Sequence, residues 1–145
     1  MLRLMIAWVP ALLCSCASSP PPQQGQPGSD PCADVELDVE KVWSAGIRAE
    51  FLGKGGEIAG ETRQAVATRL DALSRDWVML RRSVCLDHFK RQVIDKQQYA
   101  SRAQCLDQTL QRQRTLIAAL DAGSEAQPES QLQALSDEIG RCGTQ

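Results

Sequence analysis

Four cysteines in predicted helices constrain the fold of this 145-residue chain more than any other feature. They are Cys32, Cys85, Cys105 and Cys142, and each lies in a separate segment with helical hydrophobic periodicity. A disulfide requires two Cα atoms within about 7 Å, so the pairing of these cysteines decides which helices can be neighbours. We expect all four to form structural disulfides rather than a metal site or a reactive thiol.

Two helices are predicted in the first half of the domain. Asp30 and Pro31 are typical of a helix start, and an apolar stripe follows them as far as Phe51. A second helix is expected from about Glu57 to Arg91, where apolar residues alternate four and three positions apart in a heptad pattern. Glycines between the two segments predict the connecting turn.

Two further helices are predicted in the second half. Asp95, with Gln98 three residues later, forms a capping-box pattern that opens a helix ending at Gly123. Pro128 opens the last helix. Only 4% of the residues are aromatic and few prolines interrupt the later segments, which favours an all-α fold. We expect residues 31–145 to form one antiparallel up-and-down bundle of about four helices with two disulfides.

The residue numbers themselves suggest a cysteine pairing. Residues at equal height in an antiparallel hairpin have a constant sum of residue numbers. Apolar pairs of the second and third helices share one sum, and half of that sum is 95, the position of the predicted turn. The residue numbers of Cys85 and Cys105 have the same sum. Apolar pairs of the first and fourth helices share another, which includes Cys32 with Cys142. We therefore expect Cys85–Cys105 and Cys32–Cys142, with the first and fourth helices adjacent. The directions of Cys85 and Cys105 around their helices stay open, because each lies one residue off its stripe.

The start of the chain is typical of an exported lipoprotein. Arg3 precedes the apolar run Leu4–Leu13, which is shorter than the about 20 residues of a spanning helix. The sequence Leu13-Cys14-Ser15-Cys16 resembles the bacterial lipobox, so we expect residues 1–15 to be a signal peptide and Cys16 to carry the lipid. Cys14 fits less well because Leu13 stands where a small residue is expected. An ordinary secretory signal is the other alternative.

Residues 16–30 predict a lipidated cysteine followed by a flexible tether rich in proline, glutamine and serine, without large apolar side chains. In lipoproteins, the absence of aspartate after the lipidated cysteine usually accompanies transport to the outer membrane, and Ala17 stands here. We expect a membrane-anchored protein of the cell envelope that faces the periplasm. Disulfides persist in that oxidising compartment.

The domain resembles the extracytoplasmic four-cysteine helical region of large bacterial serine/threonine protein kinases with tetratricopeptide repeats. The resemblance covers nearly the whole domain and is carried by Cys32, Val42-Trp43, Arg48, Phe51, Trp77-Val78, Arg81, Cys85, Tyr99, Arg102, Cys105-Leu106 and Cys142. Kinase motifs, the repeats and the transmembrane helix of that family are absent from this sequence. The resemblance therefore implies a sensing or binding role outside the cytoplasm and no kinase activity.

Other candidate sites are weak. His88 is the only histidine, so a histidine-rich metal site cannot be built. It has no partner motif for catalysis, and a surface position near a helix end is expected. The segment Gly53-Lys54-Gly55-Gly56 lacks the spacing and hydroxyl residue of a phosphate-binding loop. The cysteines form no CxxC motif. We predict no catalytic residue, metal or cofactor.

Charge is unevenly distributed along the helices. The segment from Arg63 to Arg114 contains eleven Lys or Arg residues and five Asp or Glu residues, while the first and last predicted helices are acidic. This pattern favours charge-complementary packing of the helices; the alternative is a basic face with Arg81, Arg82 and Arg91 that contacts a partner or lipid headgroups. A net charge of −2 argues against nucleic-acid binding. We predict a non-enzymatic binding, sensing or scaffolding module for an envelope protein or small ligand, and an envelope enzyme with thiol or carboxylate chemistry as the alternative.

Overall fold

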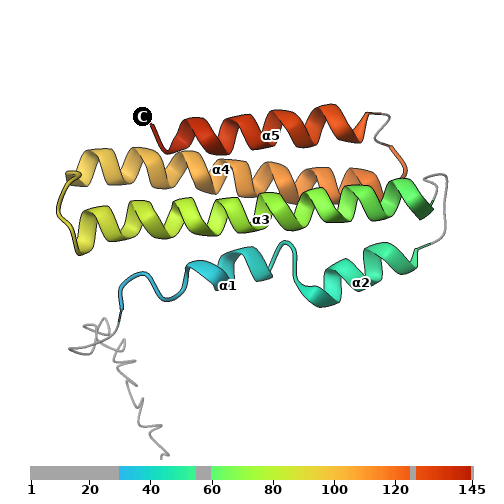
Figure 1. Ribbon diagram of the computed structural model, residues 1–145, viewed down its shortest axis with the longest axis horizontal. Helices are drawn as coiled ribbons and strands as arrows, with labels where there is room; N and C mark the ends of the chain where they lie inside the picture. Colours follow the sequence, from blue (N-terminus) through green and yellow to red (C-terminus); the bar gives the residue numbers. More distant parts are fainter. Residues whose placement is uncertain (1–29, 55–59, 125–126, 145) are drawn as a thin grey trace, which may run out of the picture.

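A computed structural model describes residues 30–54, 60–124 and 127–144 of the chain. The predicted signal peptide, Cys16, most of the tether and the Gly55-Gly56 part of the first connection lie outside these residues. Within the described residues there are five α-helices and no strand, so the predicted all-α bundle is confirmed (Figure 1). The helices are α1 (Val35–Glu40), α2 (Ala45–Gly53), α3 (Gly60–Phe89), α4 (Lys96–Asp121) and α5 (Pro128–Cys142).

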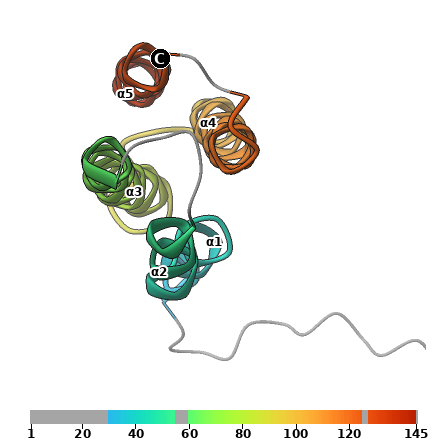
Figure 2. The same ribbon diagram turned by 90° about the vertical axis from the view of Figure 1, so that its right-hand side faces the viewer.

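An antiparallel hairpin of α3 and α4 forms the centre of the molecule. Figure 2 shows α1 and α2 on one side of this hairpin and α5 on the opposite side. α5 packs against both central helices, whereas α1 and α2 pack mainly against α3. The predicted adjacency of the first and last helices is therefore wrong, because the hairpin lies between them. The predicted adjacency of the second and third helices is confirmed.

Short-range hydrogen bonds fix both ends of α4. Asp95 Oδ1 accepts from Gln98 N at 2.8 Å, and Gln98 Oε1 accepts from Asp95 N at 3.0 Å, which is the predicted capping box. At the other end Gly123 has φ 67°, and the amides of Gly123 and Ser124 donate to the carbonyls of Leu120 and Ala119. This is a Schellman arrangement, which requires a left-handed backbone conformation at Gly123. Glycine is favoured there because it has no Cβ that would clash in that conformation. Both predicted ends of this helix are confirmed.

The predicted first helix is split in two. α1 ends at Glu40, and Ser44 then begins α2 as an N-cap whose Oγ accepts from Ile47 N at 3.2 Å. Residues 31–34 form turns, so Asp30 and Pro31 open a turn and not the α-helix that we expected. In that turn Asp30 Oδ1 accepts from Cys32 N at 3.1 Å.

The carboxylate of Asp71 on α3 explains the position of this break. It accepts hydrogen bonds from Trp43 Nε1 at 2.7 Å and from Arg48 Nε at 3.0 Å. Trp43 is the last residue before the N-cap of α2, and its ring packs edge-on against Phe51, with 5.6 Å between ring centroids. The turn thus brings the indole N–H of Trp43 and the guanidinium of Arg48 to one acceptor. The rings of Trp43 and Phe51 both stay buried.

The disulfides join Cys32 to Cys85 and Cys105 to Cys142, with Cα separations of 5.8 and 5.6 Å. Disulfide bonding of these four cysteines is confirmed, but the predicted pairing, Cys32–Cys142 and Cys85–Cys105, is wrong. Successive helical residues are rotated by about 100°, so Cys85 and Cys105, each one residue off its stripe, turn away from the α3–α4 seam. Cys85 points to the segment before α1, and Cys105 points to α5.

Two polar contacts lie inside the core between the central helices. Trp77 is fully buried, and its Nε1 donates to the Leu106 carbonyl at 2.7 Å. Gln113 Nε2 donates to Ser74 Oγ at 2.9 Å, and both residues are buried. Buried polar groups that are hydrogen-bonded in this way favour one register, since a shifted hairpin would leave them without partners.

Non-reducing peptide mapping is expected to recover the Cys32–Cys85 and Cys105–Cys142 peptides. In the chain-entropy model, sequence separations of 53 and 37 residues correspond to about 4 kcal/mol for each disulfide. Replacing either pair by alanine should therefore lower the free energy of unfolding by about this amount in a denaturant titration. The control is the parent protein with both disulfides reduced. Reduction should remove most of the difference in the free energy of unfolding between the parent and the alanine variants. A peptide that links Cys32 to Cys142 would contradict this fold.

Asp71→Ala is expected to lower the free energy of unfolding by about 2 kcal/mol, because it leaves the buried Trp43 N–H without an acceptor. Asp76→Ala is the matched control: Asp76 is exposed on the same helix and has no hydrogen-bond or ion-pair partner among the described residues. Its replacement should change stability by less than about 0.5 kcal/mol. Equal losses in the two variants would show that the Asp71 contacts do not hold α1 and α2 in place.

Candidate binding site

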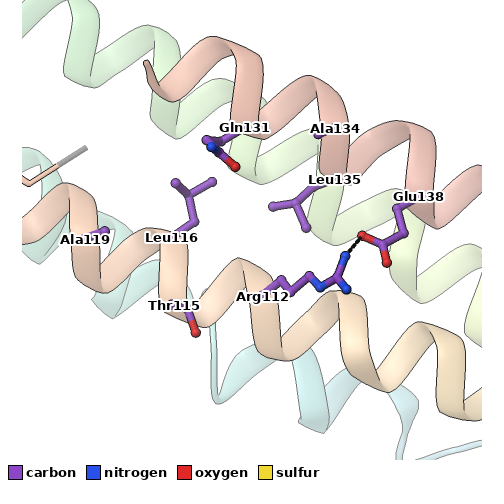
Figure 3. A pocket seen from close by; sticks show the side chains of 8 residues that line it. All are labelled: Arg112, Thr115, Leu116, Ala119, Gln131, Ala134, Leu135 and Glu138. Carbon is purple, nitrogen blue, oxygen red and sulfur yellow. Dashed lines mark hydrogen bonds and ion pairs between the residues drawn. The ribbon is translucent and has the colours of Figure 1, made fainter. Parts of the chain in front are cut away.

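A groove with a volume of about 320 Å³ runs between α4 and α5. Figure 3 shows its floor and walls, which combine two facing leucines, two alanines and four polar side chains. The lining residues are Arg112, Thr115, Leu116 and Ala119 from α4, and Gln131, Ala134, Leu135 and Glu138 from α5. This volume is at the lower end of the range of small-molecule sites, about 300–1,000 Å³.

The groove is apolar along its floor, with Arg112 and Glu138 at one end and Gln131 toward the other (Figure 3). Leu116 and Leu135 point toward each other across it, and both are buried (Figure 3). Ala119 and Ala134 leave space because a methyl group is the whole side chain. At the end nearer the Cys105–Cys142 disulfide, Arg112 Nη1 is 2.5 Å from Glu138 Oε2. The site therefore suits an apolar group with a polar end that can reach Arg112 or Gln131.

Two neighbouring hollows are less suited to hold a ligand. One, about 360 Å³, lies between α1 and α3 and is lined by Val39, Val78 and the exposed side chain of Met79. Glu36, Glu40, Ser74 and Arg75 also border it, but the surface inside it is almost wholly apolar, so few polar atoms are available to orient a ligand. The other, about 290 Å³, lies between α1 and α4 around Arg81 and Asp107 and is lined mainly by charged side chains. The α4–α5 groove combines both kinds of contact.

The sequence interpretation missed the groove because it assigned each helix one apolar stripe. α4 has two buried rows: Leu110 borders the hollow beside α1, whereas Leu116 faces α5. The signal was present in the consecutive apolar pair Leu116-Ile117, since neighbouring residues of a helix point about 100° apart. A second apolar row on a helix indicates neighbours on two sides.

The three arginines of the predicted partner-contact face point to different neighbours. Arg81 Nε lies 3.6 Å from Asp107 Oδ1 on α4, and its guanidinium lies over the Tyr99 ring. Arg82 Nη1 is 2.8 Å from Glu36 Oε1 on α1. Arg91 is paired with Asp87 at 2.7 Å. Of these pairs, Arg82–Glu36 joins α3 to α1, as charge-complementary packing of the first two predicted helices would, whereas Arg81–Asp107 joins α3 to α4 and Arg91–Asp87 joins neighbours along the chain. The structure does not gather the three side chains into one site.

Other residues singled out from the sequence have structural contacts. The His88 ring stacks on Tyr99, with 4.7 Å between ring centroids, and its Nδ1 is 3.2 Å from the Ile94 carbonyl oxygen. Lys54, in the first connection, is 2.9 Å from Asp121 Oδ2, and this hydrogen bond raises the pKa of the Lys54 ammonium. Its contact holds the end of α2 against the end of α4.

At the other side of that connection, Arg63 is buried at the start of α3. Its Nη1 donates to the Phe51 carbonyl at 3.1 Å, and its guanidinium lies 4.9 Å from the Phe51 ring centroid. A cation at the carbonyl end of α2 is favourable because the helix dipole is negative there. Arg63 therefore acts in packing α2 onto α3.

The described residues contain neither a cluster of metal ligands nor a helix that could span a membrane. No group of three or more His, Cys, Asp or Glu side chains in residues 30–54, 60–124 and 127–144 is arranged to hold a metal ion. None of the helices in the same ranges combines the length and the hydropathy that crossing a bilayer requires.

Comparisons with known proteins give no match: neither the family models, nor the curated proteins, nor the solved structures contain one that is similar to this chain. The resemblance to the four-cysteine region of bacterial kinases stays a prediction from the sequence.

Proposed function

We propose that this chain is a lipoprotein of the cell envelope whose helical domain binds a partner and does not catalyse a reaction. The lipid anchor is assigned to Cys16, with the domain on the periplasmic side of the outer membrane. In this proposal the domain is a free-standing counterpart of the sensing region that it resembles in bacterial kinases. It acts as a binding or scaffolding module for an envelope protein or small ligand.

Two kinds of observation support the envelope location. The start of the sequence has the charge, apolar run and cysteine of a lipoprotein signal. The domain contains two disulfides, and disulfides form and persist mainly in oxidising compartments. The export signal and the disulfides lie in different segments of the chain, and both favour a location outside the cytoplasm.

The α4–α5 groove is the observation that carries the binding role. It is an open site where two buried leucines, two small side chains and an ion pair meet. An apolar side chain of a partner protein, or the apolar part of a small ligand, could rest on Leu116 and Leu135 while Arg112 or Gln131 contacts its polar end. Binding sites commonly combine an apolar surface with a few placed polar groups in this way.

The alternative of an envelope enzyme has less support. Thiol chemistry needs a thiolate, and the four cysteines of the domain are bonded in pairs. Carboxylate chemistry needs a carboxylate free to exchange a proton with a substrate. Glu138, the carboxylate of the groove, is instead paired with Arg112. The arrangement favours recognition over proton transfer.

Cys16→Ala is expected to abolish palmitate labelling and membrane association of the chain, because Cys16 is the proposed lipidation site. Cys14→Ala is the matched control and should leave both unchanged. The measurement is metabolic labelling with palmitate, followed by fractionation of the envelope. Persistent labelling of the Cys16→Ala protein together with its loss in Cys14→Ala would move the anchor to Cys14.

Ala134→Trp is expected to reduce partner capture at least tenfold, because an indole would fill the groove without changing its charge. Ala118→Trp is the control, since Ala118 is exposed on α4 and does not line the groove. Both variants should keep the circular dichroism and unfolding midpoint of the parent. The measurement is crosslinking and affinity capture from envelope extract with the full chain. Equal capture by the two variants would contradict binding at the groove.

A further inference from the structure

The connection between α3 and α4 presents two apolar side chains to solvent at one end of the bundle. Phe89, the last residue of α3, is 46% exposed, and Val93 is 67% exposed. Ile94 between Val93 and the start of α4 is buried and closes the end of the core. Its neighbour Val93 faces solvent. We call Phe89, Lys90, Val93 and Lys96 the hairpin tip.

A cluster of rings holds the hairpin tip in a defined shape. The Phe89 ring lies edge-on to Tyr99 and to His88, with centroid separations of 5.3 and 4.7 Å. The backbone adds constraint: Gln92 has φ 55°, and Val93 N donates to the Asp87 carbonyl at 2.9 Å. The exposed side chains are thus presented by a fixed turn, which lowers the entropy that would be lost when they become buried.

Positive charge accompanies these apolar side chains. Lys90 and Lys96 are exposed, and within residues 30–54, 60–124 and 127–144 neither has an ion-pair partner. The acidic residues of the turn are already engaged: Asp87 pairs with Arg91 at 2.7 Å, and Asp95 caps α4. An apolar wedge flanked by unpaired cations is typical of protein surfaces that enter the interface of an anionic membrane.

The hairpin tip also lies at the end of the bundle where the described chain begins. Figure 1 shows the beginning of the described chain, the α3–α4 connection and the end of α5 at the same end of the molecule. Arg82 Nη2, two turns of α3 before Phe89, is 3.6 Å from Asp30 Oδ2. The chain between Cys16 and Asp30 can span at most about 50 Å when fully extended.

We propose that the hairpin tip docks on an anionic bilayer surface, with Phe89 and Val93 in the interface and Lys90 and Lys96 against lipid phosphates. This inference rests on the proposed lipid anchor, which would keep the tip within reach of the membrane. Anchoring raises the local concentration of lipid surface, so a small apolar wedge is enough to orient the domain. The α4–α5 groove then stays clear of the membrane.

A bilayer explains the hairpin tip better than a second copy of the chain does. A stable protein interface buries about 1,200 Å² or more in total, far more than two side chains provide. A bilayer interface needs no shape complementarity and binds through apolar contact added to charge. The salt dependence of docking should reflect both lysines, because each cation near an anionic surface contributes about fivefold to partition at low salt.

The test uses the full chain with tryptophan introduced at one of two sites. Val93→Trp places the probe at the hairpin tip, and Met79→Trp is the matched control, since Met79 is 64% exposed in the middle of α3. Each protein is anchored in phosphatidylglycerol vesicles that contain brominated lipids, which quench tryptophan at the membrane. The parent chain, measured in the same way, gives the quenching that is due to the native tryptophans. We expect clear extra quenching for Val93→Trp and none for Met79→Trp.

The same measurement on the Cys16→Ala chain with added vesicles separates this proposal from the anchor. Tip quenching that persists there at high lipid concentration supports docking even if Cys16 is not the lipidation site. Phe89→Ser with Val93→Ser should lower vesicle partition about tenfold or more, whereas Leu37→Ser with Met79→Ser should leave it unchanged. Neutral phosphatidylcholine should bind the Cys16→Ala chain at least fivefold less well than phosphatidylglycerol.

Two results would overturn membrane docking by the hairpin tip. The first is equal quenching at positions 93 and 79 in both the anchored and the Cys16→Ala forms. The second is a dimer in analytical ultracentrifugation that the Phe89→Ser with Val93→Ser variant loses while quenching is absent, since the tip would then bind another copy of the chain.

Discussion

The packing of α3 against α4 supports every other element of the described domain. α1 and α2 pack on one side of this hairpin, and α5 packs against both of its helices on the other side. This is possible because the central helices present apolar side chains on two sides, as Leu73 beside α5 and Val78 beside α1 illustrate for α3. The buried Gln113–Ser74 hydrogen bond then ties the register of the hairpin to a polar contact that only one alignment satisfies.

Features that depend on neighbouring residues were predictable from the sequence. The Asp95–Gln98 capping box, the glycine at the end of α4 and the proline that opens α5 all satisfy or avoid free backbone groups within one helical turn. Their geometry is decided by a few adjacent residues. Asp30-Pro31 is the exception, since this helix-start pattern opens a turn and α1 begins only at Val35. The α3–α4 hairpin follows from the turn at Asp95, because two long helices on either side of Asp95 have to fold back on each other.

Features that depend on direction around a helix could not be predicted. Equal height along two helices says nothing about which way a cysteine faces, and any two heptad patterns can be aligned by one shift. Cys85 and Cys105 were therefore matched by height although they face different neighbours. The split between α1 and α2 was hidden for a related reason: it is set by Asp71, 28 residues from Trp43. The α4–α5 groove required both the correct adjacency of α5 and the second apolar row of α4.

The two disulfides are gathered at one end of the bundle. Both disulfides lie at the end where the described chain begins, and each joins an outer segment to a central helix. The opposite end is held by polar contacts such as Lys54–Asp121 and Arg63–Phe51. α5 is bonded to α4 at Cys142, while its first turn at Pro128 has no covalent link to α4 apart from the connecting chain. A ligand that widens the α4–α5 groove must therefore separate Leu116 from Leu135 by moving the Pro128 end of α5, with the Cys105–Cys142 bond as the fixed point.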